Sequence, residues 1–329
     1  MTATLRAWRV HRNGEPTEVM SLDDVEVPRV GPGEALVRVR AVAVNFPDVL
    51  LARGQYQVRP EPPFVPGIEL CADVVEVGEG VERVRVGDRV VGSHIGVLAE
   101  QVVLPAALLH RAPDSLDDAR AAALTVAYQT AWFGLHRRAG LRAGETLLVH
   151  AAAGGVGTAA CQLGAAAGAR VIGVVGSEAK AEVARAAGAE HVLLRSDDVA
   201  ARVKEITGGA GADVVFDPVG GPSFEASTKC IAFEGRIVVV GFASGEIPPV
   251  RANHALVKNY SVVGLHWGLY AQKDPDLVDA AHAELVRLAD AGVLRPVVAD
   301  AVPFEKAPEA IELLATGTTT GRLVVQVAS

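Results

Sequence analysis

The segment "ETLLVHAAAGGVG", residues 145–157, constrains the fold of this chain more than any other stretch. Its first half is an apolar run typical of a buried strand, and its second half is a turn of glycine and alanine that leads into a helical pattern. A strand, a glycine-rich turn and a helix in this order direct backbone N–H groups and the positive end of the helix toward a phosphate. The turn could instead be only structural, but the strand–turn–helix setting favours a phosphate site.

The turn matches most of the dinucleotide-binding motif Gly-x-Gly-x-x-Gly. In that motif the second glycine lets the pyrophosphate approach and the third lets the helix pack tightly on the strand. Gly154 takes the second position and Gly157 the third, whereas Ala152 stands where the motif has its first glycine. We therefore predict that a dinucleotide binds at the residues that begin the helix: Gly154, Gly155, Val156 and Gly157.

Strand and helix patterns alternate from this turn to about residue 242. The alternation is typical of a parallel sheet with helices on both faces, and near-continuous Val and Ile runs are typical of strands buried on both sides. The pattern predicts a helix over residues 222–235 and a strand over residues 236–242. We therefore expect an α/β fold with a doubly wound parallel sheet in this part of the chain.

Residues 1–110 have a different pattern, in which apolar and polar residues alternate. The alternation predicts three strands, over residues 34–44, 71–78 and 81–92. Short strands separated by Gly and Pro predict a small β barrel or sandwich. A continuous helix is expected over residues 115–140, and the final strand, residues 321–327, is expected to pack back on this β domain.

The tip of the strand after the phosphate helix bears on which dinucleotide binds. An NAD-binding enzyme places Asp or Glu there for the ribose 2′-hydroxyl, whereas this tip reads Gly176-Ser177, with Glu178 one or two places late. Ser177 can donate to a phosphate, and Lys180 and Arg195 supply positive charge. These residues favour NADPH over NADH as the cofactor. The alternative is that both cations are solvated surface residues.

Composition narrows the partners and the compartment. The chain has 31 basic and 39 acidic residues, a net charge of -8, so we expect neither nucleic acid nor a membrane as a partner. Its three widely spaced cysteines form neither a disulfide framework nor a zinc cluster. The first ten residues lack the pattern of a signal peptide. We therefore expect a cytoplasmic protein.

Several stretches together resemble the quinone oxidoreductase branch of the medium-chain dehydrogenase/reductase family. They are "VHAAAGGVGTAACQLGAAAGARVIGVVGS", "NFPDVLLARGQYQ" with its Asn-x-x-Asp and Gly-x-Tyr, "FVPGIELCADVVEVGEGV", "GRIVVVGFASG" and "TTTGRLVV". The stretch "VKNYSVVGLHWGLYA" is similar to the subgroup near acryloyl-CoA reductases. The resemblance covers essentially the whole chain.

This resemblance implies a domain plan. A GroES-like β domain would occupy residues 1–124, a Rossmann NADPH-binding domain residues 125–265, and a return to the first domain residues 266–329. It also implies an active site where the domains meet. A homodimer is implied in addition, in which the Rossmann sheet continues into that of a second copy.

The resemblance further implies which residues act in catalysis. It places the loop from Asn45 to Leu50 beside the nicotinamide, so that Asn45 would bond to the cofactor or the substrate. Tyr56 would donate to the substrate oxygen, as a general acid or only as a hydrogen-bond donor. Asp48, the third candidate, could equally brace the loop, and Tyr56 could be a packing residue.

Other family positions imply contacts with the cofactor or with the substrate. Those expected at the cofactor are Phe46, Thr125, Tyr128, Gly241, Phe242, Ala243, Ser244 and Arg322. Those expected in the substrate pocket are Trp267 and Tyr270. For Tyr128, a core position in an apolar helix remains the alternative.

A zinc site is not expected. Zinc-using relatives carry Gly-His-Glu where this chain reads Gly67-Ile68-Glu69, and no cysteine lies near Asn45, where they place a first ligand. Zinc needs three or four N, S or O ligands. Without a Lewis acid, hydride transfer from NADPH suits an acceptor activated by its own conjugation. We therefore expect a quinone reductase. The alternatives are a reductase of α,β-unsaturated carbonyls, free or as acyl-CoA, and an NADPH-binding sensor or structural protein.

Overall fold

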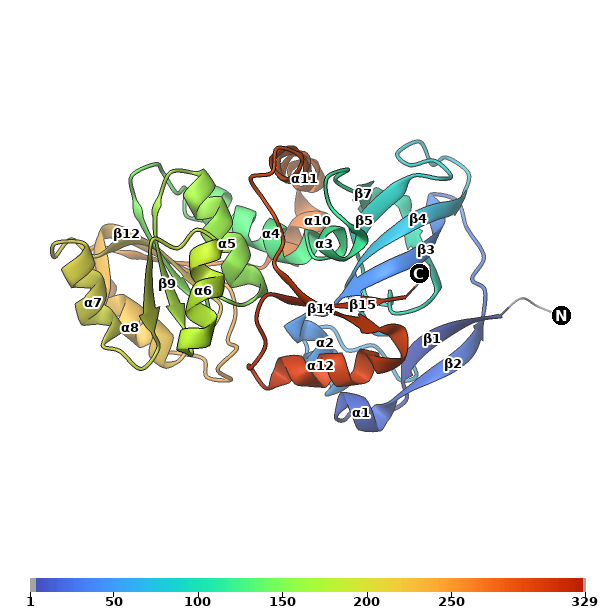
Figure 1. Ribbon diagram of the computed structural model, residues 1–329, viewed down its shortest axis with the longest axis horizontal. Helices are drawn as coiled ribbons and strands as arrows, with labels where there is room; N and C mark the ends of the chain where they lie inside the picture. The colour runs from blue at the N-terminus through green and yellow to red at the C-terminus, as the bar shows by residue number, and fades with distance from the viewer. Residues whose placement is uncertain (1–3, 328–329) are drawn as a thin grey trace. The chain divides into compact units, whose positions relative to one another are not determined.

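The computed structural model describes residues 4–327, which divide into two compact units. The first unit joins the residues up to Val126 with those from Val298 onward (Figure 1). The second unit extends from Ala127 to Val297. The two-domain α/β plan expected from the sequence is therefore present.

The C-terminal return to the first unit begins later than residue 266, where it was expected. The long helix α11 (Pro275–Asp290) belongs to the second unit. Its buried residues Val278 and Ala281 pack against Phe133 in a common apolar cluster. This apolar contact keeps the helix with the second unit.

The first unit is built mainly from antiparallel strands. β1 and β2 form a two-stranded ribbon, and a seven-stranded sheet has the order β14-β15-β3-β4-β5-β7, with β6 paired to β3. The strands are β1 (Thr4–Val10), β2 (Met20–Glu26), β3 (Glu34–Ala43), β4 (Glu69–Val77), β5 (Arg89–Ser93), β6 (Gln101–Pro105), β7 (Leu109–Arg111), β14 (Val298–Pro303) and β15 (Arg322–Gln326). β15 runs antiparallel to β3, with Val324 opposite Ala43, which confirms that the final strand packs on the N-terminal β domain.

One predicted strand is shorter than its pattern. Of residues 81–92, only the end is part of a strand, β5. The residues before it form a turn in which Gly87 has a φ of 92° and Val86 is 63% exposed. The alternating side chains of this stretch therefore do not all face the sheet.

The helix expected over residues 115–140 is interrupted. The helices of the first unit are α1 (Pro16–Val19), α2 (Phe46–Ala52), α3 (Asp118–Ala122) and α12 (Ala307–Ala315), with 3₁₀ turns η1 (Ala106–Leu108) and η4 (Phe304–Lys306); α4 (Thr125–Trp132) and the π-helical η2 (Phe133–Arg138) follow α3. The break before α4 has a physical cause. The Val126 N–H donates to the Glu69 carboxylate at 2.7 Å, so a buried acceptor from another strand replaces the helical carbonyl.

The second unit contains the doubly wound parallel sheet. Its strand order, β10-β9-β8-β11-β12-β13, is that of a dinucleotide-binding fold, with the switch point between β8 and β11. The strands are β8 (Thr146–His150), β9 (Arg170–Val175), β10 (His191–Leu194), β11 (Ala212–Asp217), β12 (Ile231–Val239) and β13 (Ser261–Gly264). The helices are α5 (Gly155–Ala166), α6 (Glu178–Ala186), α7 (Val199–Ile206), α8 (Pro222–Cys230), α9 (Ala252–Lys258), the turn η3 (Trp267–Leu269), α10 (Tyr270–Lys273) and α11.

The helix predicted over residues 222–235 is too long. α8 ends at Cys230, and β12 begins at the next residue. Glu234 takes a left-handed φ of 57°, which a helix cannot contain. The register between β11 and β12 shifts at the same level, so a bulge takes the place of the last helical turn.

Each unit has its own apolar core. In the first, buried residues of β1, β3 and β4 gather with α12. In the second, residues of β8, β9, β11 and β12 gather with α7 and α8. Within residues 4–327, no helix is both long and apolar enough to cross a membrane.

Candidate active site

The phosphate turn lies between β8 and α5, as the sequence predicts. Gly154 is the N-cap of α5. A Cβ added to Gly157 would lie 2.1 Å from the carbonyl oxygen of Ala151 and 2.9 Å from Cα of Ala152, so only glycine permits this approach of helix to turn. A Cβ added to Gly154 would meet only the Ala151 oxygen, at 3.3 Å. The turn therefore has a very close backbone contact at its third motif position and a looser one, to a single carbonyl oxygen, at its second.

Alanine at the first motif position is accommodated by a neighbouring strand. Ala152 is fully buried, and its Cβ lies 2.9 Å from where a Cβ on Gly173 of β9 would stand. The preceding residue, Ala151, takes the left-handed conformation of the turn, with a φ of 50°. Alanine therefore fits at the first motif position because the facing residue on β9, Gly173, has no side chain.

Two cations and a hydroxyl gather where β9 ends. Ser177 is the N-cap of α6, which carries Lys180 in its first turn. The N–H of Arg195 donates to the Val175 carbonyl at 2.7 Å, which fixes Arg195 beside the end of β9. Burial lowers the pKa of Lys180, and the charge of Arg195 lowers it further. An anion bound between these cations would relieve their repulsion. The open side of Gly176 faces the same group, since an added Cβ would lie 3.8 Å from an Arg195 nitrogen.

The segment that follows β12 completes this edge of the sheet. Ala243 donates to the Pro218 carbonyl at 3.1 Å and Ser244 to the Val219 carbonyl at 3.0 Å, while Phe242 is 38% exposed. The carboxyl ends of parallel strands share one edge. The structure therefore brings the phosphate turn, the cations after β9 and the residues after β12 to one edge of the second unit: Gly154, Gly155, Val156, Gly157, Gly176, Ser177, Lys180, Arg195, Gly241, Phe242, Ala243 and Ser244.

Four polar side chains form a buried cluster in the first unit. Asn45, Asp48, Glu69 and Arg322 are each at most 5% exposed. The Glu69 carboxylate accepts from the Asn45 amide at 2.9 Å, from the Val126 N–H at 2.7 Å and from the Arg322 guanidinium. The Asp48 carboxylate accepts the backbone N–H of Asn45 at 2.7 Å, which caps the start of α2. Glu69 is thus paired with the guanidinium, and Asp48 lies close enough for the charge of Arg322 to act on it.

Burial sets the charge state of this cluster. It raises the pKa of Asp48 to about 7, against the lowering effects of the Asn45 N–H and the Arg322 charge. It lowers the pKa of Arg322 to about 10, with Asp48 acting in the opposite direction. Burial, and then the charge of Asp48, raise the pKa of Tyr56. The Tyr56 phenol is therefore protonated at neutral pH and can donate a hydrogen bond.

Glu69 is absent from the predicted site residues, although it lies at the centre of the cluster. The sequence does contain a signal for Glu69, because it ends the stretch from Gly67 to Glu69 that matches the family. There, however, the prediction used only the absence of a histidine at Ile68. Arg322, expected at the cofactor, is 5% exposed and is paired with Glu69. The structure therefore gives Arg322 a bracing position at the start of β15.

The other residues expected at the cofactor, Tyr128, Thr125 and Phe46, differ in burial and in hydrogen bonding. Tyr128 is 1% exposed and donates to Gln162 at 2.9 Å, and its burial raises its pKa, which favours the core alternative. Thr125 is buried, and its hydroxyl has no hydrogen-bond partner among the described residues. Phe46 is the half-buried first residue of α2.

The two residues expected in the substrate pocket pack against the same apolar cluster of the second unit. Trp267 donates from its indole to Gln129 at 3.0 Å. The ring of Tyr270 lies 4.3 Å from that of Phe133, measured between centroids. Both aromatic residues are only partly buried, so each retains an exposed portion.

Metal-binding side chains do not group together within the described part of the chain. No three His, Cys, Asp or Glu residues there are placed to hold one ion. Glu69 is surrounded by the donors Asn45 and Arg322 rather than by further ligands.

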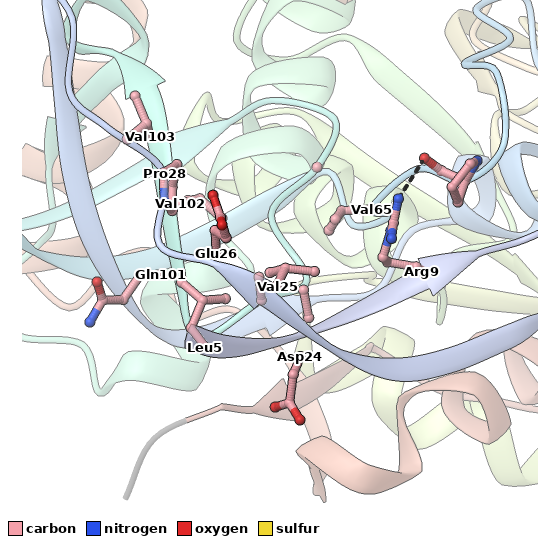
Figure 2. Close-up of a pocket in the computed structure, with 14 residues that line it drawn as sticks. Leu5, Arg9, Asp24, Val25, Glu26, Pro28, Val65, Gln101, Val102 and Val103 are labelled. Carbon is pink, nitrogen blue, oxygen red and sulfur yellow. Dashed lines mark hydrogen bonds between the residues drawn. The ribbon is translucent and has the colours of Figure 1, made fainter. Parts of the chain in front are cut away.

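A cavity of about 560 Å³ opens in the first unit, between the β1–β2 ribbon and β6 (Figure 2). Arg9, labelled in Figure 2, lies at the border of the cavity and donates to the Pro63 carbonyl at 3.4 Å. Apolar residues such as Leu5, Val25 and Val65 line it. None of the residues expected at the cofactor or the substrate does.

Known protein families match both units. The model described as "Alcohol dehydrogenase GroES-like domain" matches residues 31–114, and the one described as "Zinc-binding dehydrogenase" matches residues 155–283. Both descriptions fit the strand orders of the two units.

Individual relatives align along nearly all of the chain. "Quinone oxidoreductase-like protein 2 homolog" of Nematostella vectensis is 39% identical over 97% of this chain and 88% of its own length. "Mycocerosic acid synthase-like polyketide synthase" of Mycobacterium tuberculosis is 35% identical over 95% of this chain and 15% of its own length. The structure of Escherichia coli quinone oxidoreductase complexed with NADPH has a TM-score of 0.90 and 31% identity, and the match covers 98% of this chain and 99% of that one. The chain therefore belongs to the medium-chain dehydrogenase/reductase family and, within it, is similar to the quinone oxidoreductases.

Proposed function

We propose that this protein is an NADPH-dependent oxidoreductase that needs no metal and delivers a hydride or electrons to a quinone. The observation that carries the proposal is the edge of the parallel sheet in the second unit. There α5 begins at Gly154 and Gly155, which carry no side chains, and Ser177, Lys180 and Arg195 supply donors and positive charge. The bound NADPH of the Escherichia coli relative supports the same cofactor.

The residues of the second unit fit this cofactor by their chemistry. Helix α5 leaves its first N–H groups without helical partners, and these can hold the pyrophosphate. The 2′-phosphate distinguishes NADPH from NADH, and it needs several donors and nearby cations. Lys180 and Arg195 provide the cations and Ser177 a hydroxyl. When bound, NADPH supplies a hydride from its nicotinamide ring.

In the first unit, Tyr56 is the residue that would donate a hydrogen bond to the acceptor oxygen. The side-chain N–H groups of Asn45 are taken by the Ala43 carbonyl and by Glu69, so Asn45 shapes the start of α2. Tyr56 keeps its proton at neutral pH and can stabilise a developing negative charge on a quinone oxygen.

Metal-free chemistry is supported by the surroundings of Glu69. Its carboxylate accepts three N–H donors, from Asn45, Val126 and Arg322. A carboxylate that accepts three N–H donors is a poor metal ligand, because most of its lone pairs are already used. A quinone needs no Lewis acid, since its own conjugation makes it electron-poor.

A second candidate acceptor is an α,β-unsaturated carbonyl, free or as a thioester. A segment of a relative named as a polyketide synthase aligns with this chain, and such a carbonyl, like a quinone, is electron-poor through its own conjugation. A CoA thioester would need basic side chains for its phosphates, and one basic residue of the first unit, Arg53, is already paired with Glu15. A third candidate is a protein that binds NADPH with little catalysis.

We also propose that a second copy of this chain covers one side of the second unit. β13 is an edge strand of the parallel sheet. The neighbouring helix α9 buries none of its residues, and its Leu256 and Val257 are 77% and 78% exposed. Apolar edges of this kind need cover. A two-fold partner would continue the sheet from β13.

The cofactor assignment is tested by K180A and R195A. Each removes a charge-assisted bond to a 2′-phosphate, worth about 1.5–3 kcal/mol, so KM for NADPH should rise about 10- to 100-fold. KM for NADH should stay unchanged. K204A, at an exposed position on α7, is the matched control. Equal losses for both dinucleotides would contradict the 2′-phosphate assignment.

The acceptor is tested by steady-state rates with NADPH. The panel is 1,4-benzoquinone, 9,10-phenanthrenequinone, an alkenal and crotonyl-CoA, each with and without a chelator. Quinone preference unaffected by the chelator is the expected result. A much higher kcat/KM on the alkenal or the thioester would move the assignment to ene reduction. Tight NADPH binding without turnover would favour the sensor, and loss of activity with the chelator would contradict metal-free chemistry.

A further inference from the structure

Asp217 ends β11 at the edge of the sheet where the cofactor residues gather, yet no motif includes it. It is 1% exposed, and one carboxylate oxygen accepts the N–H groups of Val219 at 2.9 Å and Gly220 at 3.0 Å. The other oxygen has no hydrogen-bond partner among the described residues. Burying a carboxylate with one oxygen unpartnered costs stability. This sets Asp217 apart from an aspartate that only caps a surface turn.

The two bonds to Asp217 fix a loop that in turn holds the segment after β12. The Pro218 carbonyl accepts the Ala243 N–H at 3.1 Å. The Val219 carbonyl accepts the Ser244 N–H at 3.0 Å and the Ser244 hydroxyl at 2.8 Å. Asp217 thereby determines, through residues 218–220, where Ala243 and Ser244 lie.

The loop of residues 218–220 packs tightly against residues 242–246. Gly220 has a φ of 72°, and an added Cβ would lie 2.8 Å from the Phe242 ring and 2.9 Å from the Glu246 carbonyl oxygen. A shift of the loop would therefore move the residues around Phe242 as well.

On its other side Asp217 neighbours the phosphate turn. Phe216 pairs with Val149 in the parallel register, which places Asp217 beside His150, the last residue of β8. Burial lowers the pKa of His150, and the charge of Asp217 raises it. His150 contacts the Ser227 hydroxyl at 2.8 Å. The carboxylate thus stands between the strand that leads into the phosphate turn and the loop that holds the segment after β12.

We propose that Asp217 is a positioning residue for the dinucleotide: its carboxylate sets residues 218–221, and through them residues 241–244, in the arrangement that accepts the cofactor. The inference rests on the proposed function, because it takes the ligand to be a nicotinamide dinucleotide. The segments it positions are distinct from the cations at the end of β9. Its removal therefore weakens NADPH and NADH alike, whereas removal of Lys180 or Arg195 weakens NADPH alone.

Variants at the two ends of β11 separate positioning from simple stabilisation. D217A removes both bonds to the loop and should raise the Kd of NADPH and of NADH about tenfold each, as measured by fluorescence titration. D217N keeps an oxygen for both N–H groups and should restore Kd to within about threefold of wild type. D213A is the control, because Asp213 accepts the Thr146 N–H at 2.8 Å at the other end of the same strand. It should lower Tm and leave both Kd values unchanged.

The outcomes distinguish the inference from the proposed function. Wild-type protein that binds neither dinucleotide would contradict both. Wild-type protein that binds NADPH, with D217A binding equally well, would overturn the inference alone. Dinucleotide binding by D217N that is as weak as that by D217A would also overturn it, because the hydrogen bonds from Val219 and Gly220 would then not explain the loss of affinity. If D217A does not fold, S244A replaces it, since loss of the hydroxyl bond to Val219 should weaken both dinucleotides about two- to threefold. An unchanged S244A would count against the proposal.

Discussion

Replacing Asp48 with asparagine should stabilise the first unit, by an amount that grows with pH. Asp48 is 1% exposed, and burial raises its pKa from an ordinary value of 3.8 to about 7. Between these two values the unfolded chain has released the proton while the folded protein still holds it. Wild-type stability therefore falls as pH rises through this window and levels off above about pH 7. Asparagine has no proton to lose, so D48N escapes the decline.

The magnitude follows from the width of the window. Each pH unit within the window is worth about 1.36 kcal/mol, so relative to low pH the wild type has lost about 1.5 kcal/mol of stability at pH 5 and about 4 kcal/mol at pH 8. The asparagine oxygen can still accept the Asn45 N–H, which lies 2.7 Å from Asp48. For a unit of this size, about 2–4 °C of Tm accompanies each kcal/mol. D48N should therefore melt roughly 10 °C higher than wild type at pH 8 and a few degrees higher at pH 5.

Thermal melts from pH 5 to pH 8 test this prediction. Trp8 is a buried fluorescent reporter within the first unit. D24N, an exposed substitution on β2 of the same unit, is the control and should show no gain that grows with pH. A D48N gain that is equal at all pH values, or a loss at pH 8, would refute the reasoning from burial.

Three further substitutions test other parts of the structure. G157A should weaken NADPH binding and cost about 1–3 kcal/mol of stability, because the new Cβ would lie 2.1 Å from the Ala151 carbonyl oxygen; a wild-type Kd and Tm would contradict the close contact. R322M should destabilise the first unit by about 3–5 kcal/mol in denaturant unfolding, since it leaves the Glu69 carboxylate buried without its cation; a loss under about 1 kcal/mol would contradict this. L256E should convert a dimer to a monomer in analytical ultracentrifugation, and an unchanged mass would place the interface elsewhere.

Local patterns predict the second unit well for a physical reason. A strand buried on both faces must be apolar throughout, and a helix that covers it must repeat every 3.6 residues, so both are visible in the sequence. The phosphate turn is equally local, because Gly154 and Gly157 meet only atoms of their own turn. These features need no knowledge of distant parts of the chain.

The buried cluster of the first unit depends on distant contacts instead. Glu69 meets Arg322 across 253 positions and the Val126 N–H across 57. The second of these contacts also breaks the helix that the periodicity of residues 115–140 predicts as continuous. Nothing near Val126 in the sequence signals that an acceptor from β4 will take its N–H. Contacts of this kind decide the helix boundary, which is why it differs from expectation, and they hold Arg322 against Glu69.

The same cluster gives the proposed reaction a pH dependence that does not arise from Tyr56 itself. With Asp48 protonated, Glu69 and Arg322 balance each other; as pH rises through about 7, Asp48 ionises and adds a negative charge. That charge raises the pKa of Tyr56 and makes its phenol a weaker donor to the acceptor oxygen. kcat with a quinone should therefore decline above about pH 7 in wild type, and the decline should disappear in D48N. Y56F should have a low kcat that does not decline further above about pH 7. If kcat of D48N depends on pH as that of the wild type does, the decline arises from another titratable group, and Asp48 only braces the loop.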